Sequence, residues 1–287
     1  MTVPPDLFPP RAPQSHKGDF GRVGIVAGST GLTGAAALCG LGALRVGAGL
    51  VTVAMPASQQ PILAVKLTEA MTVAMPETKA QTLSLKALPA LTEFAERSDA
   101  LAIGPGLSQQ SETKQLIRQW LPMLRTPTVL DADGLNAVAE DLAVLKRLAQ
   151  PIIVTPHPGE MARLITLSAE DVQSDRERIA QEFAKKYGVI VVLKGHRTIV
   201  ANVDGASSVN ETGNPGMASG GVGDVLTGMI AGLLGQRLAL FDAARLAVHL
   251  HGLAGDLAAE RRGTVGLIAS DLVDTIPDAI RRYQQCR

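Results

Sequence analysis

A glycine-rich segment followed by a long apolar run constrains this chain more than any other feature. The segment reads Asn214-Pro-Gly-Met-Ala-Ser-Gly-Gly-Val-Gly-Asp224, and residues 225–235 continue it without proline. Glycine permits positive φ angles and lets a ligand approach the main chain. Where such a loop opens a helix, unpaired N–H groups and the helix dipole favour an anion. The segment therefore predicts an anion nest formed by Gly220, Gly221, Val222 and Gly223.

An acidic residue, Asp224, follows the predicted nest directly. A carboxylate at that place would repel a phosphate, so it is a poor phosphate ligand. It fits a base that takes the proton from a hydroxyl attacking a phosphoryl group held in the nest. The simpler alternative is an N-cap of the following helix. Five glycines and a long apolar helix behind the Asp favour the catalytic interpretation.

Composition and charge exclude several classes of protein. The chain has 287 residues, 46% of them hydrophobic, which suits one large α/β domain, predicted over residues 16–287. The formal net charge is zero and only 3% of the residues are aromatic, which argues against nucleic-acid binding. Cys39 and Cys286 lie too far apart for a disulfide framework or a metal cluster and fit a reducing cytoplasm.

The N-terminal region carries neither a secretory signal nor a membrane span that we can recognise. Residues 1–15 contain five prolines and are expected to be extended and mobile, or laid along a neighbouring surface. The longest uncharged run, 23–44, is interrupted by glycines and is better explained as strand, loop and helix. We therefore expect a cytoplasmic protein without membrane contact.

Short β-branched runs alternate with helical stretches along the chain. This alternation predicts a mostly parallel central sheet covered by helices on both faces. A near-copy, Thr52–Pro56 and Thr72–Pro76, predicts two strands flanking a short helix, and residues 198–202 with 206–210 predict a hairpin. Helices are expected, among others, at 35–46, 83–97, 109–124, 175–187, 241–260 and 270–284.

Five marked turns lie at predicted carboxyl ends of strands, where ligands bind in open α/β sheets. They are residues 28–34, 104–106, 131–136, 155–160 and 194–195. Their expected convergence at one edge is stronger evidence than any one turn. Lys194 could meet a phosphate as a point charge.

Two of these turns leave alternatives open. Asp131 and Asp133 could hold Mg²⁺ through water, or a polar substrate, but Asp133 or Asn136 could equally cap the next helix. His157 stands between two prolines that hold its ring, and it is either a site residue or an ordinary surface histidine. His249 and His251 lie two apart on one predicted helix and should face different sides, so a metal pair is not expected.

Taken together, these motifs resemble the ADP- or ATP-dependent NAD(P)H-hydrate dehydratases, which have a ribokinase-like fold. The resemblance covers residues 16–277, nearly the whole chain. The residues that carry it are His16-Lys-Gly-Asp-Phe-Gly, Gly28-Ser, Gly34-Ala-Ala, Gly47-Ala-Gly-Leu-Val51, Gly104-Pro-Gly106, Asp131-Ala-Asp-Gly-Leu-Asn136, Thr155-Pro-His-Pro-Gly-Glu160, Lys194-Gly195 and Asn214-Pro-Gly-Met-Ala-Ser-Gly-Gly-Val-Gly-Asp224.

The resemblance implies repair of hydrated nicotinamide cofactors, the S-form of NADHX or NADPHX. The ring hydroxyl is phosphorylated from a nucleotide, and phosphate then leaves. The matching positions imply contacts of the hydrated dinucleotide with Ala35, Gly106, His157 and Asp224. Those implied for the adenine nucleotide are Lys194, Gly195, His196, Arg197, Thr198 and Gly223.

The resemblance also implies a preference for ADP among bacterial members, Mg²⁺ and a homotetramer. It leaves open whether Asp131, Asp133 or Glu160 holds the Mg²⁺. Many relatives carry an N-terminal epimerase domain, for which residues 1–15 are too short, so we expect any epimerase to be a separate chain. The Pro-rich leader matches no motif of the family.

Two rival functions are compatible with parts of the pattern. A kinase of the same fold, acting on a sugar, thiazole or pyridoxal-type alcohol, would carry a similar nest and Asp, but Gly104-Pro-Gly106 and His157-Pro-Gly-Glu160 argue against it. A non-catalytic nucleotide sensor would need the pocket but no base, so Asp224 argues against a sensor.

Overall fold

One nine-stranded sheet forms the centre of the computed structural model, which describes residues 7–8 and 11–285. The strand order is β3-β2-β1-β4-β5-β6-β7-β8-β9. All pairs from β3 to β7 are parallel, and only β7–β8 and β8–β9 are antiparallel. The strands are β1 (Arg22–Val26), β2 (Leu50–Pro56), β3 (Met71–Met75), β4 (Ala100–Ile103), β5 (Thr128–Leu130), β6 (Ile153–Val154), β7 (Ile190–Leu193), β8 (Ile199–Ala201) and β9 (Ser207–Val209).

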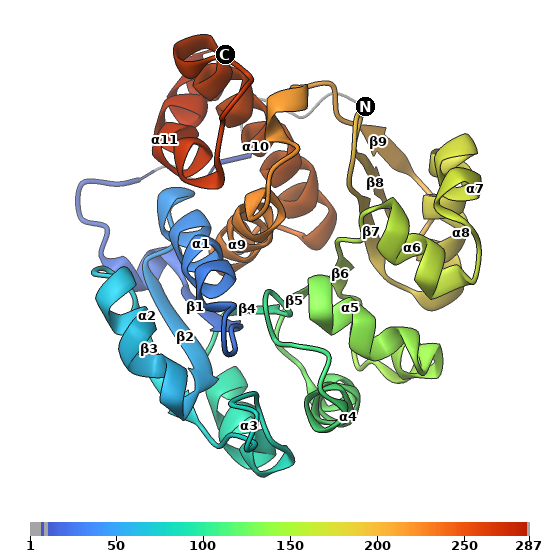
Figure 1. Ribbon diagram of the computed structural model, residues 1–287. Coiled ribbons are helices and arrows are strands. Elements are labelled where there is room, and N and C mark those ends of the chain that lie inside the picture. Colours follow the sequence, from blue (N-terminus) through green and yellow to red (C-terminus); the bar gives the residue numbers. More distant parts are fainter. Residues whose placement is uncertain (1–6, 9–10, 286–287) are drawn as a thin grey trace.

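Helices connect the strands and surround the sheet (Figure 1). The α-helices are α1 (Thr33–Arg45), α2 (Gln60–Lys66), α3 (Leu88–Glu96), α4 (Ser111–Trp120), α5 (Ala132–Ala139), α6 (Pro158–Ile165), α7 (Ala169–Ser174), α8 (Arg176–Tyr187), α9 (Val222–Gly235), α10 (Leu240–Arg262) and α11 (Ala269–Gln285). Short 3₁₀ helices are η1 (Lys17–Phe20), η2 (Ala57–Gln59), η3 (Leu85–Ala87), η4 (Leu121–Met123), η5 (Leu142–Arg147) and η6 (Pro215–Met217).

The two faces of the sheet carry separate cores. Along β4, Ala100 and Ala102 belong to one core, whereas Leu101 and Ile103 belong to the other. This alternation follows from the period of two along a strand. One core joins the sheet to α1, α2, α9, α10 and α11, and the other joins it to α3 through α8. The expected parallel sheet with helices on both faces is therefore confirmed.

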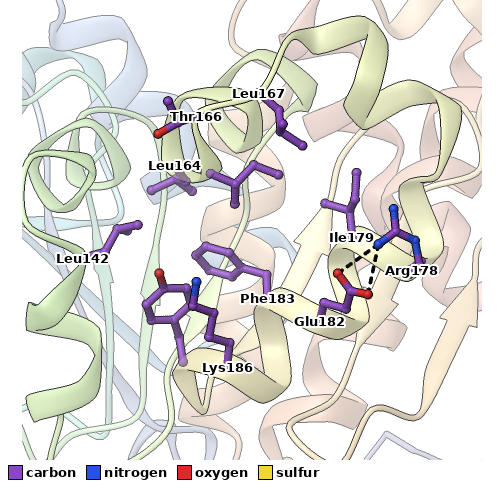
Figure 2. Close-up of a pocket in the computed structure, with 11 residues that line it drawn as sticks. Leu142, Leu164, Thr166, Leu167, Arg178, Ile179, Glu182, Phe183 and Lys186 are labelled. Carbon is purple, nitrogen blue, oxygen red and sulfur yellow. Dashed lines mark hydrogen bonds and ion pairs between the residues drawn. The ribbon is translucent and has the colours of Figure 1, made fainter.

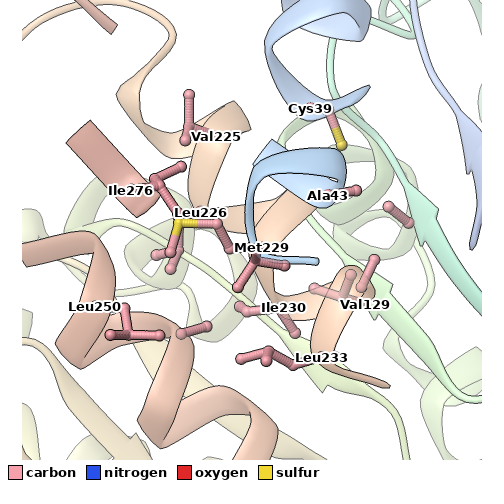
Figure 3. Packing of buried hydrophobic residues seen from close by; sticks show 14 of the residues in the cluster. Cys39, Ala43, Val129, Val225, Leu226, Met229, Ile230, Leu233, Leu250 and Ile276 are labelled. Carbon is pink, nitrogen blue, oxygen red and sulfur yellow. The ribbon is translucent and has the colours of Figure 1, made fainter. Parts of the chain in front are cut away.

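Helix α9 packs unusually close to α1, and glycines make this approach possible. A Cβ atom on Gly228 would lie 1.9 Å from the carbonyl oxygen of Cys39, and one on Gly42 would lie 2.4 Å from that of Val225. Figure 3 shows apolar side chains of several elements gathered around α9, among them Cys39 of α1 and Leu250 of α10. Because backbone meets backbone, the position of α9, and of the residues at its start, is tightly fixed.

Most expected elements are confirmed, with shifted boundaries. The near-copy gives β2 and β3, which flank α2 and pair in parallel, and the hairpin gives β8 and β9. The helix expected over 175–187 is confirmed as α8 and begins one residue later, because Asp175, with a φ of −146°, is its N-cap and also ends α7. Helix α7 itself was not expected.

The described part of the proline-rich leader lies against the domain. The Phe8 ring is buried, with its centroid 6.2 Å from that of Tyr283 in α11. Arg11 donates to the carbonyl of Gly47 at 2.7 Å and stacks over Phe20. These contacts agree with a leader laid along a surface, while residues 1–6, 9 and 10 lie outside the described residues. Over the described residues, every helix is too short or too polar to cross a membrane.

Candidate active site

The marked turns meet at one edge of the sheet, as expected. The parallel registers pair Val26 with Ile103, Ile103 with Leu130 and Leu130 with Val154, so these strands end side by side. Backbone hydrogen bonds tie the turns together: the N–H of Gly28 donates to the carbonyl of Pro105, and that of Lys194 to the carbonyl of Pro156. Residues distant in sequence therefore face one shared space above the sheet.

The glycine-rich segment leads into α9, but the helix begins at Val222, before Asp224. The N-cap is Gly221, with a φ of 89°, and Asp224 lies inside the first helical turn. The capping alternative for Asp224 is therefore wrong. Within the described residues, the N–H groups of Val222, Gly223 and Asp224 have no hydrogen-bond partner. These free donors and the positive end of the helix dipole are the features of an anion site.

Asp224 has the electrostatic setting of a base rather than of an ordinary surface carboxylate. Its pKa is raised to about 7, first because burial disfavours the charged form and then because the carboxylate of Asp131 is near. Asp133 and Glu160 add to the rise, and Lys194 opposes it. A carboxylate with a pKa close to neutrality can accept a proton efficiently at physiological pH.

A buried ion pair links two strand ends beneath this edge. The Nζ of Lys194 lies 2.7 Å from Oδ1 of Asp131, whose side chain is 1% exposed, and 3.8 Å from Oε2 of Glu160. Thr227 of α9 donates to Oδ2 of Asp131 at 2.6 Å. Burial alone would lower the pKa of Lys194, but Asp131 and Glu160 outweigh it and the pKa lies above its usual value. Lys194 therefore stays charged near the nest.

The region 131–136 forms a helix start that differs from both capping expectations. Helix α5 begins at Ala132, with Asp131 at the N-cap position, so Asp133 and Asn136 lie inside the helix and neither caps it. Asp133 instead accepts from the N–H of Ser108 and from the side chain of Asn136. The φ of Ala132 is +48°. This left-handed conformation is uncommon for residues other than glycine, so an alanine in the sequence does not signal it.

His157 is the N-cap of α6, and hydrogen bonds fix its ring. Its Nδ1 accepts from the N–H groups of Gly159 and Glu160 at 3.0 and 3.3 Å. The carboxylate of Glu160 accepts in turn from the backbone of His157 at 2.8 Å. The ring is thus held by this capping box, in addition to the flanking prolines, while 54% of the side chain remains exposed.

A cavity of about 700 Å³ opens beside the nest. All six residues expected at the nucleotide line it: Lys194, Gly195, His196, Arg197, Thr198 and Gly223. His157 also lines it. The rest of the lining was not among the predicted ligand residues and consists mainly of residues 210–215 and 217–219, with His251 and Gly252 of α10. His251 is buried and bonds Val222 through Nε2, whereas His249 contacts Tyr283, so the two histidines do face different sides.

The remaining residues expected at the dinucleotide, Ala35 and Gly106, come from α1 and from the turn after β4. Ala35 and Gly106 are neighbours, since a Cβ on Gly106 would lie 3.2 Å from that of Ala35. Both are outside the lining of the 700 Å³ cavity. Asp224 acts electrostatically on the Cys39 thiol of α1, the helix that also carries Ala35, and helps to raise the pKa of that buried thiol.

A second hollow, of about 430 Å³, lies far from these groups, between α6 and α8 (Figure 2). Its walls are mainly apolar, with Leu164 and Phe183 among them. The Arg178 guanidinium at its rim is paired with Glu182. The hollow contains none of the expected site residues.

Carboxylates are numerous at the site, but they do not form a cage for a metal. Among the described residues, no group of three or more His, Cys, Asp or Glu side chains could hold an ion. Asp131 is occupied by Lys194 and Thr227, and Asp133 by Asn136. This donor set fits Mg²⁺ of the kind that arrives with nucleotide phosphates and is held by one or two carboxylates plus the phosphates.

Comparison with known proteins places the chain in a family. The sequence profile described as NAD(P)H-hydrate dehydratase matches residues 23–278. A bifunctional NAD(P)H-hydrate repair enzyme of Moorella thermoacetica is 50% identical over 278 residues, which cover 97% of this chain and 52% of that relative. An ADP-dependent (S)-NAD(P)H-hydrate dehydratase of Bacillus subtilis is 34% identical over 277 residues, covering 96% of this chain and 95% of that protein.

Solved structures agree with the sequence comparison. The crystal structure of the ADP/ATP-dependent NAD(P)H-hydrate dehydratase from Bacillus subtilis, co-crystallised with ATP/Mg²⁺, superimposes with a TM-score of 0.83 at 33% identity, covering 96% and 94% of the two chains. Ribokinase of Arabidopsis thaliana shares the fold, with a TM-score of 0.56 at 13% identity over 90% of this chain and 98% of that one. The ribokinase-like fold is thereby confirmed.

The chain spans about half the length of the bifunctional relatives that it matches, and nearly all of the single-function relative from Bacillus subtilis. The matched region contains the glycine-rich segment and all of the sheet except Arg22, the first residue of β1. The chain belongs to the NAD(P)H-hydrate dehydratase family.

Proposed function

We propose that this protein restores NADH or NADPH from the S-form of the hydrated cofactor, with an adenine nucleotide as phosphoryl donor. One observation carries the proposal. Asp224, with a pKa of about 7, lies in the first turn of α9, beside free N–H donors and the cavity lined by the six expected nucleotide residues. A base, an anion site and a nucleotide-sized cavity therefore adjoin one another.

In this mechanism Asp224 takes the proton of the ring hydroxyl while the hydroxyl oxygen attacks the terminal phosphorus of the nucleotide. The bond from that phosphorus to the bridging oxygen breaks, and the N–H groups of 222–224 hold the developing negative charge. The new phosphoester then leaves as phosphate, and loss of a proton from the neighbouring ring carbon restores the double bond. With ADP as donor, the products are the reduced cofactor, AMP and phosphate.

The remaining site residues have positioning roles in the proposal. Lys194, paired with Asp131 at 2.7 Å, presents its charge to the phosphates, and residues 195–198 line the nucleotide. Ala35, Gly106 and His157 contact the hydrated dinucleotide. Mg²⁺ bound with the nucleotide would supply further positive charge at the phosphates, and Asp131, Asp133 or Glu160 would hold it.

We extend the proposal to the setting of the enzyme. Residues 16–287 act as one catalytic domain, in the cytoplasm, and assemble as a homotetramer. The hydrate and the adenine nucleotide are its partners, whereas nucleic acid and membrane are not. An epimerase acting on the other hydrate form lies outside these 287 residues, since the bifunctional relatives are about twice as long as this chain.

A kinase that phosphorylates a small alcohol is the second candidate, because ribokinase shares the fold. The kinase and dehydratase mechanisms share the first step and differ in whether phosphate then leaves. Incubation of the hydrate with the protein and ADP, ATP or no nucleotide, followed by absorbance at the reduced-nicotinamide band, separates them. Nucleotide-dependent recovery of absorbance supports the dehydratase, and a stable phosphorylated product without recovery would contradict it.

A further inference from the structure

Helix α10 supports the part of the cavity wall formed by segment 212–217, and the support runs along one helical face. A Cβ on Gly252 would lie 2.2 Å from Oγ1 of Thr212, and one on Gly255 would lie 2.3 Å from Sδ of Met217. The hydroxyl of Thr212 also donates to the carbonyl of His249. Residues 249, 252, 255 and 256 share a face at spacings of three and four. Segment 212–217 therefore rests directly on α10.

Asp256 fixes the register of this contact from the same face. Its Oδ2 accepts from the N–H of Gly213 at 2.9 Å, and its Oδ1 accepts from Nδ2 of Asn214 at 3.0 Å. The other side-chain atom of Asn214, Oδ1, accepts from the N–H of Gly216 at 3.0 Å. One carboxylate thus holds two successive residues of the wall and, through Asn214, the 3₁₀ turn that follows.

The far end of the glycine-rich segment is held by α10 as well. Nε2 of His251 lies 2.9 Å from the carbonyl of Val222, the first residue of α9. A carbonyl only accepts, so the ring nitrogen is the donor. Side chains of α10 therefore form hydrogen bonds to the segment on both sides of the exposed Gly220, at Gly213–Asn214 and at Val222.

We propose that Asp256 is a positioning residue that sets nucleotide affinity by holding segment 212–217 as the cavity wall. The proposal rests on the proposed function in one respect, that the 700 Å³ cavity takes the adenine nucleotide. Asp256 itself is outside the residues that line the cavity, so its effect passes through Gly213 and Asn214. Residues 212–215 and 217 line the cavity together with Gly195–Thr198, so displacement of the segment should alter the nucleotide site.

The hydrogen bond between Asp256 and Asn214 defines a test in which the two side chains are exchanged. In Asp256→Asn, an amide NH₂ must face either the N–H of Gly213 or the NH₂ of Asn214, and donors do not pair. Asn214 cannot turn over without losing the bond from Gly216. In the exchanged pair Asp256→Asn with Asn214→Asp, the amide at 256 donates to the carboxylate at 214, which still accepts from Gly216. The exchange keeps composition and charge.

The experiment is a calorimetric titration of each protein with ADP and with ATP, without hydrate, together with melting curves and the KM for hydrate. We expect Asp256→Asn to weaken nucleotide binding at least tenfold with a hydrate KM within about twofold of wild type, and the exchanged pair to recover affinity to within about threefold. Glu260→Gln removes one charge from an exposed position of the same helix and should bind normally.

The outcomes separate the two claims. Normal binding by Asp256→Asn, or an exchanged pair that melts like the wild type yet binds no better than the single variant, overturns the role of Asp256 alone. A wild-type protein that binds neither nucleotide overturns the proposed function together with this inference. Should Asp256→Asn not fold, Asp256→Glu, which keeps the charge but displaces it by one methylene, must lower affinity at least threefold for the inference to stand.

Discussion

Lys194 and Asp131 are 63 residues apart in sequence, yet their side chains form a 2.7 Å ion pair under the carboxyl edge of the sheet. Lys194 follows β7 and Asp131 follows β5, with β6 between these strands in the sheet. The pair keeps a cation fixed beside the nest and keeps the buried carboxylate neutralised. It couples nucleotide binding to the stability of the fold, because either partner alone would be an uncompensated buried charge.

Lys194→Ala should therefore have two effects. Loss of a charged hydrogen-bond donor should weaken nucleotide binding by about 1.5–3 kcal/mol. Loss of the partner of Asp131 should also destabilise the fold by about 3 kcal/mol. Nucleotide KM and urea unfolding measure these effects separately. Adding Asp131→Asn should restore stability without restoring affinity, and an unchanged nucleotide KM in Lys194→Ala would remove Lys194 from the site.

The raised pKa of Asp224 predicts how stability changes with pH. Because the folded-state pKa is about 7 against an ordinary 3.8, ionisation of this group opposes folding. The free energy of unfolding that the protonated carboxyl group of Asp224 contributes is fully present below about pH 4, and it is lost as the pH rises through about 7. Asp224→Asn should thus unfold at higher denaturant than wild type at pH 8, by at most about 4 kcal/mol. The difference should shrink towards pH 5, and a constant difference would contradict the assignment.

Two neighbouring glycines of the nest should respond differently to alanine. Gly221 has a φ of 89°, and a Cβ there would lie 2.4 Å from Cδ1 of Leu38, so Gly221→Ala should lower the melting temperature. A Cβ on Gly220 would meet no described atom within 4 Å. Gly220→Ala should therefore melt like wild type. It should nevertheless lose activity, because the added methyl group would clash with the ligand bound at the nest. Full activity of Gly220→Ala would place the anion elsewhere.

His157→Asn should separate orientation from proton transfer. Asparagine is a good N-cap, so α6 and the melting temperature should be preserved. The ring, which is fixed by Gly159 and Glu160, is lost, and the KM for hydrate should rise. The shape of the pH–rate profile should stay the same. Disappearance of one limb would instead identify His157 as an acid or base.

Much of the fold could be predicted because its signals are local. Most strands are short runs rich in β-branched residues, and turn residues such as Gly104-Pro-Gly106 mark where strands end. Parallel strands end at one edge, so finding the turns was enough to gather Lys194, His157 and the nest at one place. The nine-stranded order itself had no comparable local signal, whereas helix α7 had one that was missed, the capping box of Ser168 and Asp171.

The parts that sequence missed depend on backbone conformation or on long-range contacts. Gly221 caps α9 in place of Asp224, and Ala132 adopts a left-handed φ that moves the start of α5 to just after Asp131. The pairs Asp131–Lys194 and Asp256–Gly213 join residues 63 and 43 positions apart. Residue spacing along the chain carries no information about such partners until the sheet and helices are packed.

The central claim is that Asp224 accepts the proton of the attacking hydroxyl. Its most direct test is the rate at which Asp224→Asn restores reduced-nicotinamide absorbance from the hydrate with saturating ADP or ATP, compared with wild type. Asparagine keeps the shape of the side chain but cannot take the proton, so we predict a loss of roughly 10²–10⁴-fold in kcat, with nucleotide affinity little changed. Asp224→Asn turning over at close to the wild-type rate would contradict the account.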